Sequence, residues 1–384
     1  MKEENTLSGQ KKLRNRRIWK KCIIALFLLV LVLIGGLMVL RYITYEHINV
    51  VEVYDNKSVA NGNYKEYADG VIEYSKDGIA YLKEDGSEIW NQPCQMRNPF
   101  AEICQGAVAV ADKGGTNILV FQEEGLKGEI KTTRPIEKVS VSAQGIVAAM
   151  LTDDEIPQIM CYDAKGNVLV ELNATFSSTG YPVDIALSQD GNVLIVSYLK
   201  IKGVSAESQV VYYHFGEAGE HAEEHKVAEL EFAGAVVPIT AFLDEENSLL
   251  VSDSSFVLMK GLEKPETINE ITFDKQICKV AYDEEMIAFV LKDQGQDGYE
   301  LCTYDLKGQE VFRTNIEKEY LNLKISKGQV ILTDGSECAI YNDLGICKYA
   351  GNTEIQILDM FPASGLEKYN VISTDGFQKI QLVK

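Results

Sequence analysis

The feature that most constrains this chain is an apolar run of four to eight residues that recurs eight times after residue 60. The runs start at Val71, Ala107, Ile146, Asn192, Ser248, Met286, Gln329 and Val371. Their starts are about 43 residues apart on average, which is the length of one four-stranded propeller blade. The sequence therefore predicts an all-β fold, a β-propeller of eight four-stranded blades. Seven blades are the alternative if the long fourth unit, near 191–246, is irregular.

Turn signals separate the strands of each unit. The residue before the apolar run is glycine in five of the eight units, as a tight hairpin favours. A second turn follows the third strand and reads MCYDAKG at 160–166 in the third unit and LCTYDLKG at 301–308 in the sixth. In this motif the aspartate side chain folds back on its own backbone, and the glycine supplies a positive φ. We expect a short hairpin at each copy.

These hairpins resemble the Tyr-x-Asp-x-x-x-Gly-x-x-x-Trp repeats of quinoprotein-like (PQQ-like) propellers, over about residues 60–384. A cruder copy at 81–90 ends in Trp90, where the resemblance implies a packing role. The layout of a basic tail, one apolar segment and an acidic propeller is also similar to a family of uncharacterised, membrane-anchored envelope proteins of Gram-positive bacteria. The resemblance implies a propeller architecture, and the second family implies no established activity.

The eighth unit offers only three strands before the sequence stops, whereas the alternating segment 48–54 belongs to no unit. We expect residues 45–56 to supply the outer strand of the eighth blade, because closing the ring removes free sheet edges. The segment before them would then lead almost directly into the propeller.

Residues 22–40 are nineteen consecutive uncharged residues, enough for a helix of roughly 28 Å to cross a bilayer. We expect an uncleaved signal anchor at 22–44, with Cys22, Leu31 and Leu40 in its apolar run, because the run exceeds the usual signal-peptide length and no A-x-A-like site follows. The basic tail, 1–21, would stay in the cytoplasm under the positive-inside rule. The residues that set this topology are Lys11, Lys12, Arg14, Arg16, Arg17, Lys20 and Lys21.

Charge limits the partners of the expected extracytoplasmic domain, 45–384. The chain has a net charge of −20. The tail contributes eight basic and two acidic residues, a charge of +6, so the rest of the chain has a net charge of −26. Such a surface repels nucleic acid and anionic lipid. We therefore expect no nucleic-acid binding, a single-pass membrane location, and an envelope protein or glycan as partner.

The strongest candidate for metal chemistry is His221-Ala222-Glu223-Glu224-His225, which fits the H-x-x-E-H pattern. That pattern needs one helix with both histidines on one face and a third ligand elsewhere. Here it lies in a polar stretch between two predicted strands, so we expect a loop, with His221 and His225 as weak metal candidates. The segment 293–298 partly resembles a calcium loop but lacks carboxylates where an EF-hand needs them, so a solvated turn is favoured.

Other catalytic signals are absent from the sequence. Quinone enzymes stack the flat cofactor on tryptophan, but Trp90 is the one tryptophan after the tail. No G-x-S-x-G elbow and no phosphate-binding glycine loop occur. We therefore expect no catalytic residue and no cofactor.

Seven cysteines follow the apolar segment, an odd number that leaves at least one unpaired within the chain. Cys338 with Cys347, and Cys94 with Cys104, are the two pairings that the hairpin spacing leaves open. Most of the seven lie in apolar strand patterns, so we expect mainly reduced, structural cysteines.

The sequence thus favours a membrane-anchored extracytoplasmic propeller that binds or scaffolds an envelope protein or glycan. The alternative is an enzyme, a metal-dependent hydrolase or a quinone-dependent oxidoreductase, whose site is assembled from several blades. A third interpretation makes the basic tail the signalling end, binding anionic lipid or a cytoplasmic partner.

Overall fold

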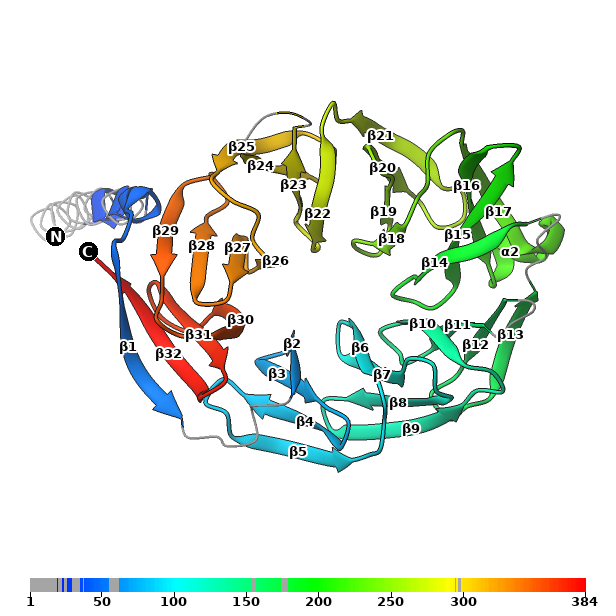
Figure 1. Cartoon of the computed structure of the whole chain (residues 1–384), viewed down its shortest axis with the longest axis horizontal. Coiled ribbons are helices and arrows are strands. Elements are labelled where there is room, and N and C mark those ends of the chain that lie inside the picture. Colours follow the sequence, from blue (N-terminus) through cyan, green and yellow to red (C-terminus); the bar gives the residue numbers. More distant parts are fainter. Residues whose placement is uncertain are drawn as a thin grey trace, which may run out of the picture.

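The computed structural model describes residues 19, 23, 26–29, 35, 36, 38–54, 62–152, 157–173, 179–293, 295 and 298–384. Within these residues, the strands form eight four-stranded antiparallel sheets arranged in a ring around a central channel (Figure 1). The eight-bladed propeller that the repeat predicts is therefore confirmed.

Each of the first seven blades uses four strands that are consecutive in the chain, the first lying at the channel and the last at the rim (Figure 1). Blades 1 and 2 consist of β2 (Asn63–Tyr67), β3 (Gly70–Tyr74), β4 (Gly78–Lys83), β5 (Glu88–Pro93), β6 (Pro99–Cys104), β7 (Ala107–Asp112), β8 (Asn117–Gln122) and β9 (Gly125–Lys131). Blades 3 and 4 consist of β10 (Ile136–Val141), β11 (Val147–Leu151), β12 (Gln158–Tyr162), β13 (Val168–Asn173), β14 (Tyr181–Leu187), β15 (Val193–Lys202), β16 (Ser205–His214) and β17 (Lys226–Phe232). The turn from β16 to β17 contains the short helices α2 (Glu217–Glu220) and η2 (Glu223–His225).

The remaining blades follow the same plan. Blades 5 and 6 consist of β18 (Ile239–Phe242), β19 (Asn247–Val251), β20 (Ser255–Lys260), β21 (Glu266–Thr272), β22 (Gln276–Tyr282), β23 (Met286–Lys292), β24 (Tyr299–Asp305) and β25 (Glu310–Ile316). Blade 7 consists of β26 (Asn322–Ser326), β27 (Gln329–Asp334), β28 (Glu337–Tyr341) and β29 (Cys347–Asn352). Blade 8 consists of β30 (Ile357–Pro362), β31 (Lys368–Ser373), β32 (Gly376–Val383) and β1 (His47–Tyr54).

Blade 8 closes the ring with strands from both ends of the described chain. Its outer strand is β1, which pairs with β32 in antiparallel register from His47 opposite Val383 to Tyr54 opposite Phe377. The closing strand predicted at 45–56 is confirmed over His47–Tyr54, and residues 55 and 56 lie outside the described residues. This pairing covers the rim of β32, which would otherwise be a free edge.

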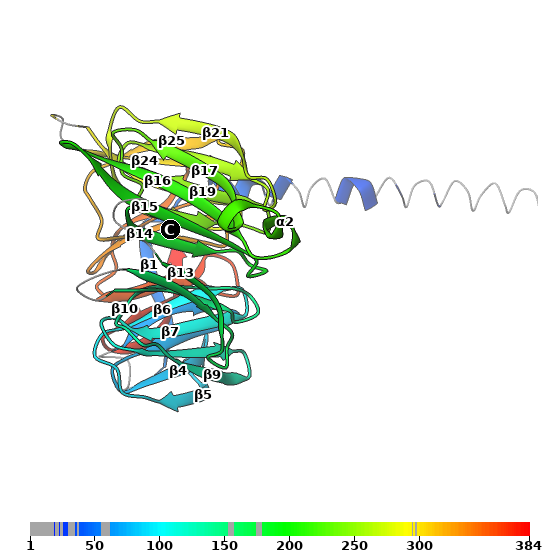
Figure 2. The same ribbon diagram turned by 90° about the vertical axis from the view of Figure 1, so that its right-hand side faces the viewer.

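The ring has two distinct faces because neighbouring strands run in opposite directions. Turns between first and second strands and between third and fourth strands lie on one face, and turns between second and third strands lie on the other. The segment 40–45 contacts the first of these, which we call the helix face, where Tyr45 N donates to the Lys348 carbonyl at 2.8 Å. Figure 2 shows α2 on the same side as the blue N-terminal helical residues. We call the other side the opposite face.

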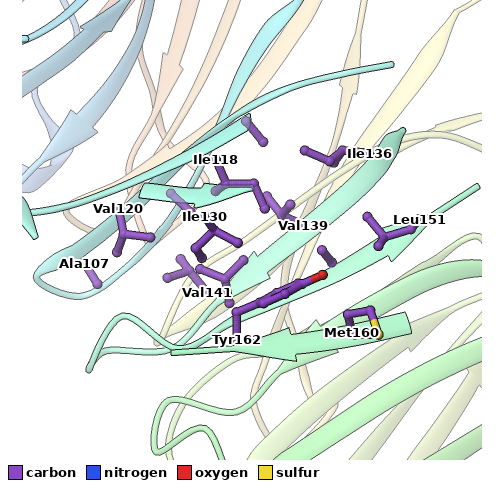
Figure 3. Packing of buried hydrophobic residues seen from close by; sticks show 14 residues of the cluster. Ala107, Ile118, Val120, Ile130, Ile136, Val139, Val141, Leu151, Met160 and Tyr162 are labelled. Carbon is purple, nitrogen blue, oxygen red and sulfur yellow. The ribbon is translucent and has the colours of Figure 1, made fainter. Parts of the chain in front are cut away.

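The core lies between blades, where side chains of adjacent sheets interlock. At the interface of blades 2 and 3, Ile118, Val120 and Ile130 pack against Val139 and Tyr162 (Figure 3). Between blades 1 and 2, the Trp90 ring stacks on Phe121 with centroids 4.8 Å apart, and its Nε1–H donates to the Glu123 carbonyl at 3.0 Å. Trp90 therefore has the packing role that the repeat implied, since ring stacking and a satisfied N–H are typical of a buried tryptophan.

The hairpin motif folds as predicted. The Asp163 carboxylate accepts hydrogen bonds from the backbone N–H groups of Lys165 and Asn167, each at 2.9 Å, and Gly166 takes a φ of +87°. Hydrogen bonds from Asn167 hold the pKa of the Asp163 carboxyl below its usual value. Asp305 repeats the arrangement by accepting from the N–H of Lys307 at 2.9 Å. The recurring aspartate thus fixes the turn on the helix face.

The apolar segment is only partly described. Across the part of the chain that the structure describes, no helix is long and apolar enough to cross a membrane. The predicted anchor residues Cys22 and Leu31, and the basic residues of the tail, lie outside the described residues. The anchor and its topology remain predictions.

Candidate functional site

The candidate site is the central channel, which is lined by the first strand of each blade (Figure 1). It divides into two lobes, one of about 1250 Å³ beside blades 1, 6, 7 and 8, and one of about 310 Å³ beside blades 2 to 5. Both lobes are lined by Glu102 of β6 and Tyr282 of β22. The strands β6 and β22 lie on opposite sides of the ring (Figure 1). Blades 2 and 6 therefore border both lobes of the channel.

Tyr282 is the aromatic residue that lines both lobes. It keeps 39% of its surface exposed. Burial of the hydroxyl, together with the nearby Glu102 charge, raises the pKa of Tyr282 to about 12. Tyr282 therefore stays protonated near neutral pH and offers the channel a hydrogen-bond donor.

In the larger lobe, Lys324 connects three blades. Its Nζ lies 3.0 Å from both carboxylate oxygens of Asp359 in blade 8 and 3.4 Å from the Glu66 carboxylate in blade 1. Ser326 also donates to Glu66, at 2.8 Å. Burial raises the pKa of the Asp359 carboxyl, and the Lys324 charge opposes that rise. Lys324 thus offsets part of the charge of two carboxylates that the inner strands bring together.

A second cluster connects blades 3, 4 and 5. Asp184 is almost fully buried, forms an ion pair with Lys138, and accepts hydrogen bonds from the Thr240 N–H at 2.6 Å and the Thr240 hydroxyl at 3.0 Å. Burial lowers the pKa of the Lys138 ammonium. Together the two clusters join inner strands that share no ladder hydrogen bonds. Each cluster pairs a lysine with at least one carboxylate, so the charges are largely compensated within the ring.

Irregularities in the inner strands position several of these side chains. The pairing register of the first and second strands shifts just before Lys138, Asp184, Lys279 and Asp359. A β-bulge of this kind adds one residue to one strand and redirects the next side chain. In the described residues, the bulges of β10, β14 and β30 therefore precede three of the five charged groups in the two clusters, Lys138, Asp184 and Asp359, whereas Lys324 and Glu66 lie in regular ladders.

A third charged group lies on the helix face, where the chain enters the propeller. The buried Lys348 Nζ donates to the Leu40 carbonyl at 3.0 Å and forms an ion pair with Glu367 at 3.0 Å. Asn342 Nδ2 donates to the Arg41 carbonyl at 2.8 Å, and the Arg41 guanidinium pairs with Asp343. These contacts satisfy carbonyls at the end of the helical residues 38–42, where the intrahelical partners are missing.

The metal candidates His221 and His225 do not share a continuous helix. His221 is the C-cap residue that follows α2, whereas His225 ends η2. Positive φ values of 52° at Glu224 and 62° at His225 break the helical path between them. The His225 ring contacts Phe215, with centroids 6.1 Å apart. In the described residues, no group of three His, Cys, Asp or Glu side chains is placed to hold a metal ion. Of the calcium-like segment 293–298, residues 294, 296 and 297 lie outside the described residues.

The seven cysteines after the apolar segment are free thiols. Cys338 lies opposite Gly351 and Cys347 lies opposite Tyr341 in the β28–β29 ladder, so the two sulfurs are not cross-strand partners. Cys94 directly follows β5 and Cys104 ends β6, and these points are on opposite faces of the ring. Neither pairing that the spacing left open is formed.

Sequence reasoning did not identify the channel clusters or the Lys348 group. The sequence did mark the Lys348 group, because Lys348 is the one charged residue in the β29 segment CKYAGN, a segment whose pattern is otherwise typical of a strand. For Asp359 and Asp184, the apolar runs around them gave no indication that an extra residue turns them toward neighbouring blades.

Comparison with known proteins agrees with the fold. The model of a family described as "Family of unknown function (DUF5711)" matches residues 41–382. No curated protein matches the sequence.

Solved propellers resemble the chain in structure at low identity. BamB from Moraxella catarrhalis superposes with a TM-score of 0.54 at 11% identity, over 87% of this chain and 99% of that one. The C-terminal WD40 domain of Sif2 gives a TM-score of 0.58 at 12% identity, over 88% of this chain and 99% of that one. The computationally designed Ika8 protein gives a TM-score of 0.57 at 13% identity, over 88% of this chain and 99% of that one. BamB is built from PQQ-like repeats, so the resemblance drawn from the hairpin motif is confirmed at the level of the fold.

Proposed function

The chain belongs to the DUF5711 family, and we propose that it is a membrane-anchored, extracytoplasmic propeller that serves as a binding or scaffolding module of the cell envelope. In this proposal residues 22–44 are the anchor, the tail 1–21 is cytoplasmic, and the propeller presents a protein-binding surface.

The observation that carries this proposal is the attachment of the segment 40–45 to the helix face. Lys348, Asn342 and Asp343 hold the end of the helical residues directly against blade 7, with no free linker between them. An anchor whose apolar run ends at Leu40 would therefore hold the whole ring in one orientation. Fixed presentation of a broad surface is what a scaffold requires, because preorganisation lowers the entropy cost of binding.

The charge of the helix face determines how closely the ring would approach the bilayer. The turns on the helix face contain twenty acidic and four basic residues. Such a surface is repelled by anionic headgroups, so the ring would stand off the bilayer rather than lie flat on it. The opposite face would then point away from the membrane and be free for partners.

A cross-linking experiment in intact cells tests the binding role. The tagged full-length protein is cross-linked, captured and analysed by mass spectrometry beside a variant that keeps residues 1–44 and lacks the propeller. We expect one dominant envelope protein with the full chain and its loss with the variant. A partner that remains with residues 1–44 alone, or no partner above background, contradicts the binding role.

Protease treatment of intact, wall-free cells tests the topology. With a tag at each end, we expect the C-terminal tag to be digested and the N-terminal tag to be protected until the cells are lysed. A protected C-terminal tag contradicts the proposed orientation, whatever the cross-linking shows.

The enzyme alternative has one favouring observation. Asp359, with its raised pKa, and the Lys324 ammonium lie together in a lobe of about 1250 Å³. A buried carboxyl of perturbed pKa beside an amine is the kind of pair that catalytic sites use. The purified full-length protein is assayed for bound metal by elemental analysis and for quinone binding by absorbance titration. One equivalent of either would favour the enzyme, and substoichiometric amounts would favour the module.

A further inference from the structure

Blade 4 has a hairpin that outreaches its own sheet. β15 and β16 are ten residues each, and they pair along their whole length from Val193 opposite His214 to Lys202 opposite Ser205. The inner neighbour β14 begins opposite Leu199, and the outer neighbour β17 ends opposite Ser208. Residues 200–207 therefore form a two-stranded extension, which we call the ribbon. It lies on the opposite face, and in Figure 2 β15 runs toward the side away from the N-terminal helix.

The base of the ribbon is held firmly. The Ser208 N–H donates to the Ala235 carbonyl at 2.8 Å, and the Ser208 hydroxyl accepts from the Val237 N–H at 2.9 Å. From the other strand, the Ser197 hydroxyl donates to the Val237 carbonyl at 2.7 Å. Two serines thus clamp the hairpin against the segment that leads to blade 5. The ribbon projects from a fixed base and is already in a strand conformation.

The ribbon exposes apolar side chains and strand edges that are normally covered within a sheet. The Ile201 side chain is 78% exposed, and Val204 at the tip is fully exposed. Residues 203–206 are exposed as well, and no strand among the described residues pairs with the outer side of residues 205 and 206. A two-stranded ribbon is marginal by itself, and open edges with bare β-branched side chains favour the addition of another strand.

The charge of the ribbon points to one kind of partner. The segment 200–207 reads KIKGVSAE, with two lysines and one glutamate, in a chain whose net charge is −20. A local basic segment on an acidic protein attracts acidic surfaces and disfavours basic ones. Under the proposed orientation the ribbon also points away from the bilayer, which disfavours a lipid surface as its ligand.

We propose that the ribbon binds an exposed edge strand of an acidic envelope protein. The added strand pairs with a free side of the ribbon, Ile201 and Val204 contact its apolar side chains, and Lys200 meets its carboxylates. This inference rests on the proposed binding function and locates its surface.

The test places a photo-cross-linking amino acid at position 204 of the full-length protein in intact cells, and at position 169 on the helix face as the control site. Leu169 is also an exposed apolar residue, 51% exposed, at the start of β13. Peptide-level mass spectrometry then identifies the residues joined to position 204. We expect an adduct at position 204 alone, on a strand segment rich in Asp and Glu. An adduct with lipid, with a basic segment, with a helical segment or with a second copy of this chain overturns the proposal.

A shortened variant separates this proposal from the broader function. Residues 201–206 are replaced by Asn-Gly, which joins Lys200 to Glu207, a cross-strand pair, by a two-residue turn. Lys200→Glu and Val204→Ser are the point variants, and Val53→Ser, at a 62% exposed site on β1, is the matched control. We expect the shortened variant to recover at least tenfold less of the partner, and the control to recover the normal amount. Normal recovery by the shortened variant overturns the ribbon site while the binding module stands, and loss of any partner from all proteins, the wild type included, overturns both.

Discussion

The Lys348 ammonium lies 3.0 Å from the Glu367 carboxylate beneath the segment that enters the propeller, and both side chains are largely buried, at 3% and 13% exposed. Among the described residues, the second oxygen of Glu367 has no hydrogen-bond partner, and Glu367 itself takes a φ of 51°. This pair lies between blades 7 and 8, where β1 and β32 close the ring. The same lysine holds the Leu40 carbonyl, so ring closure and helix attachment share one group.

Replacing this lysine should destabilise the protein. Lys348→Met leaves a buried carboxylate without its cation, which typically costs about 3–5 kcal/mol of unfolding free energy. The measurement is the urea midpoint of the full-length protein in detergent, with protease cleavage at residues 41–46 as a second readout. Adding Glu367→Gln removes the unpaired charge and should recover part of the loss. Lys264→Met, which removes an exposed pair with Glu266, is the control and should change little. Equal midpoints for all four proteins would show that the pair is dispensable.

A second prediction concerns pH and blade 6. The pKa of the Glu300 carboxyl is lowered below 4.5 because Lys275 hydrogen-bonds to it and Arg313 donates to it at 2.7 Å. A depressed folded-state pKa adds stability that is present above the unfolded-state pKa and is lost as the pH falls through the folded value. Glu300→Gln should therefore cost about 1–2 kcal/mol at pH 7, and the difference from wild type should shrink below about pH 4.5.

Thermal unfolding between pH 3 and pH 7 measures this effect. The control is Glu129→Gln, an exposed carboxylate whose oxygen lies 3.7 Å from the Lys131 Nζ, and it should follow the wild-type curve throughout. A stability gap for Glu300→Gln that stays constant down to pH 3 would rule out this ionisation as its cause.

The cysteines give a prediction about reactivity. Burial raises the thiol pKa of Cys161, Cys302 and Cys338 to about 12. Near pH 8 the thiolate fraction of such a group is on the order of 10⁻⁴, so alkylation should be very slow. The partly exposed Cys94 and Cys278 should react at least tenfold faster with iodoacetamide in the native protein.

Mass spectrometry after timed alkylation measures these rates, and the same reaction in urea is the control, in which all sites should react alike. Rapid native labelling of Cys338, or a mass two units lower from a Cys338–Cys347 bridge, would contradict the structure.

The sequence predicted the ring well because the determinants of each blade are local. A glycine before the second strand and an aspartate after the third strand specify hairpins within about 40 residues, so the eight units could be counted directly. The segment 48–54 could be placed because its alternating pattern had no other unit to join. The His221–His225 segment was correctly separated from a continuous helix, although its two short helical turns were not predicted.

The candidate site was harder to predict because its groups are brought together by ring closure. Leu40 and Lys348 are 308 residues apart, and Glu66 meets Ser326 across 260 residues. The blade repeat in the sequence carries no information about such long-range contacts. The bulge before Asp359 adds one residue that the apolar pattern does not mark, and that residue decides whether the carboxylate reaches Lys324. Charged residues within strands were therefore visible in the sequence, but their partners were not.

The last prediction tests whether the Lys324 cluster holds blades 7, 8 and 1 together. Lys324→Met leaves Asp359 and Glu66 without their shared cation, which we expect to cost about 3–5 kcal/mol at pH 7.5. The Asp359 pKa is already raised by burial and rises further without Lys324. A raised folded-state pKa makes the free energy of unfolding fall as the pH rises above the unfolded-state pKa of 3.8. The Lys324→Met variant should therefore lose the least stability at acidic pH.

Urea midpoints at pH 5 and pH 7.5 measure this loss in the full-length protein, with Trp90 fluorescence reporting the neighbouring interface of blades 1 and 2. Lys324→Arg keeps the charge and should retain most of the stability. Adding Asp359→Asn to Lys324→Met should restore part of the loss and remove most of its pH dependence, because the titrating carboxylate is gone. If Lys324→Met instead unfolds at the wild-type midpoint at both pH values, the cluster does not hold the inner strands, and its charges are free for a ligand in the larger lobe.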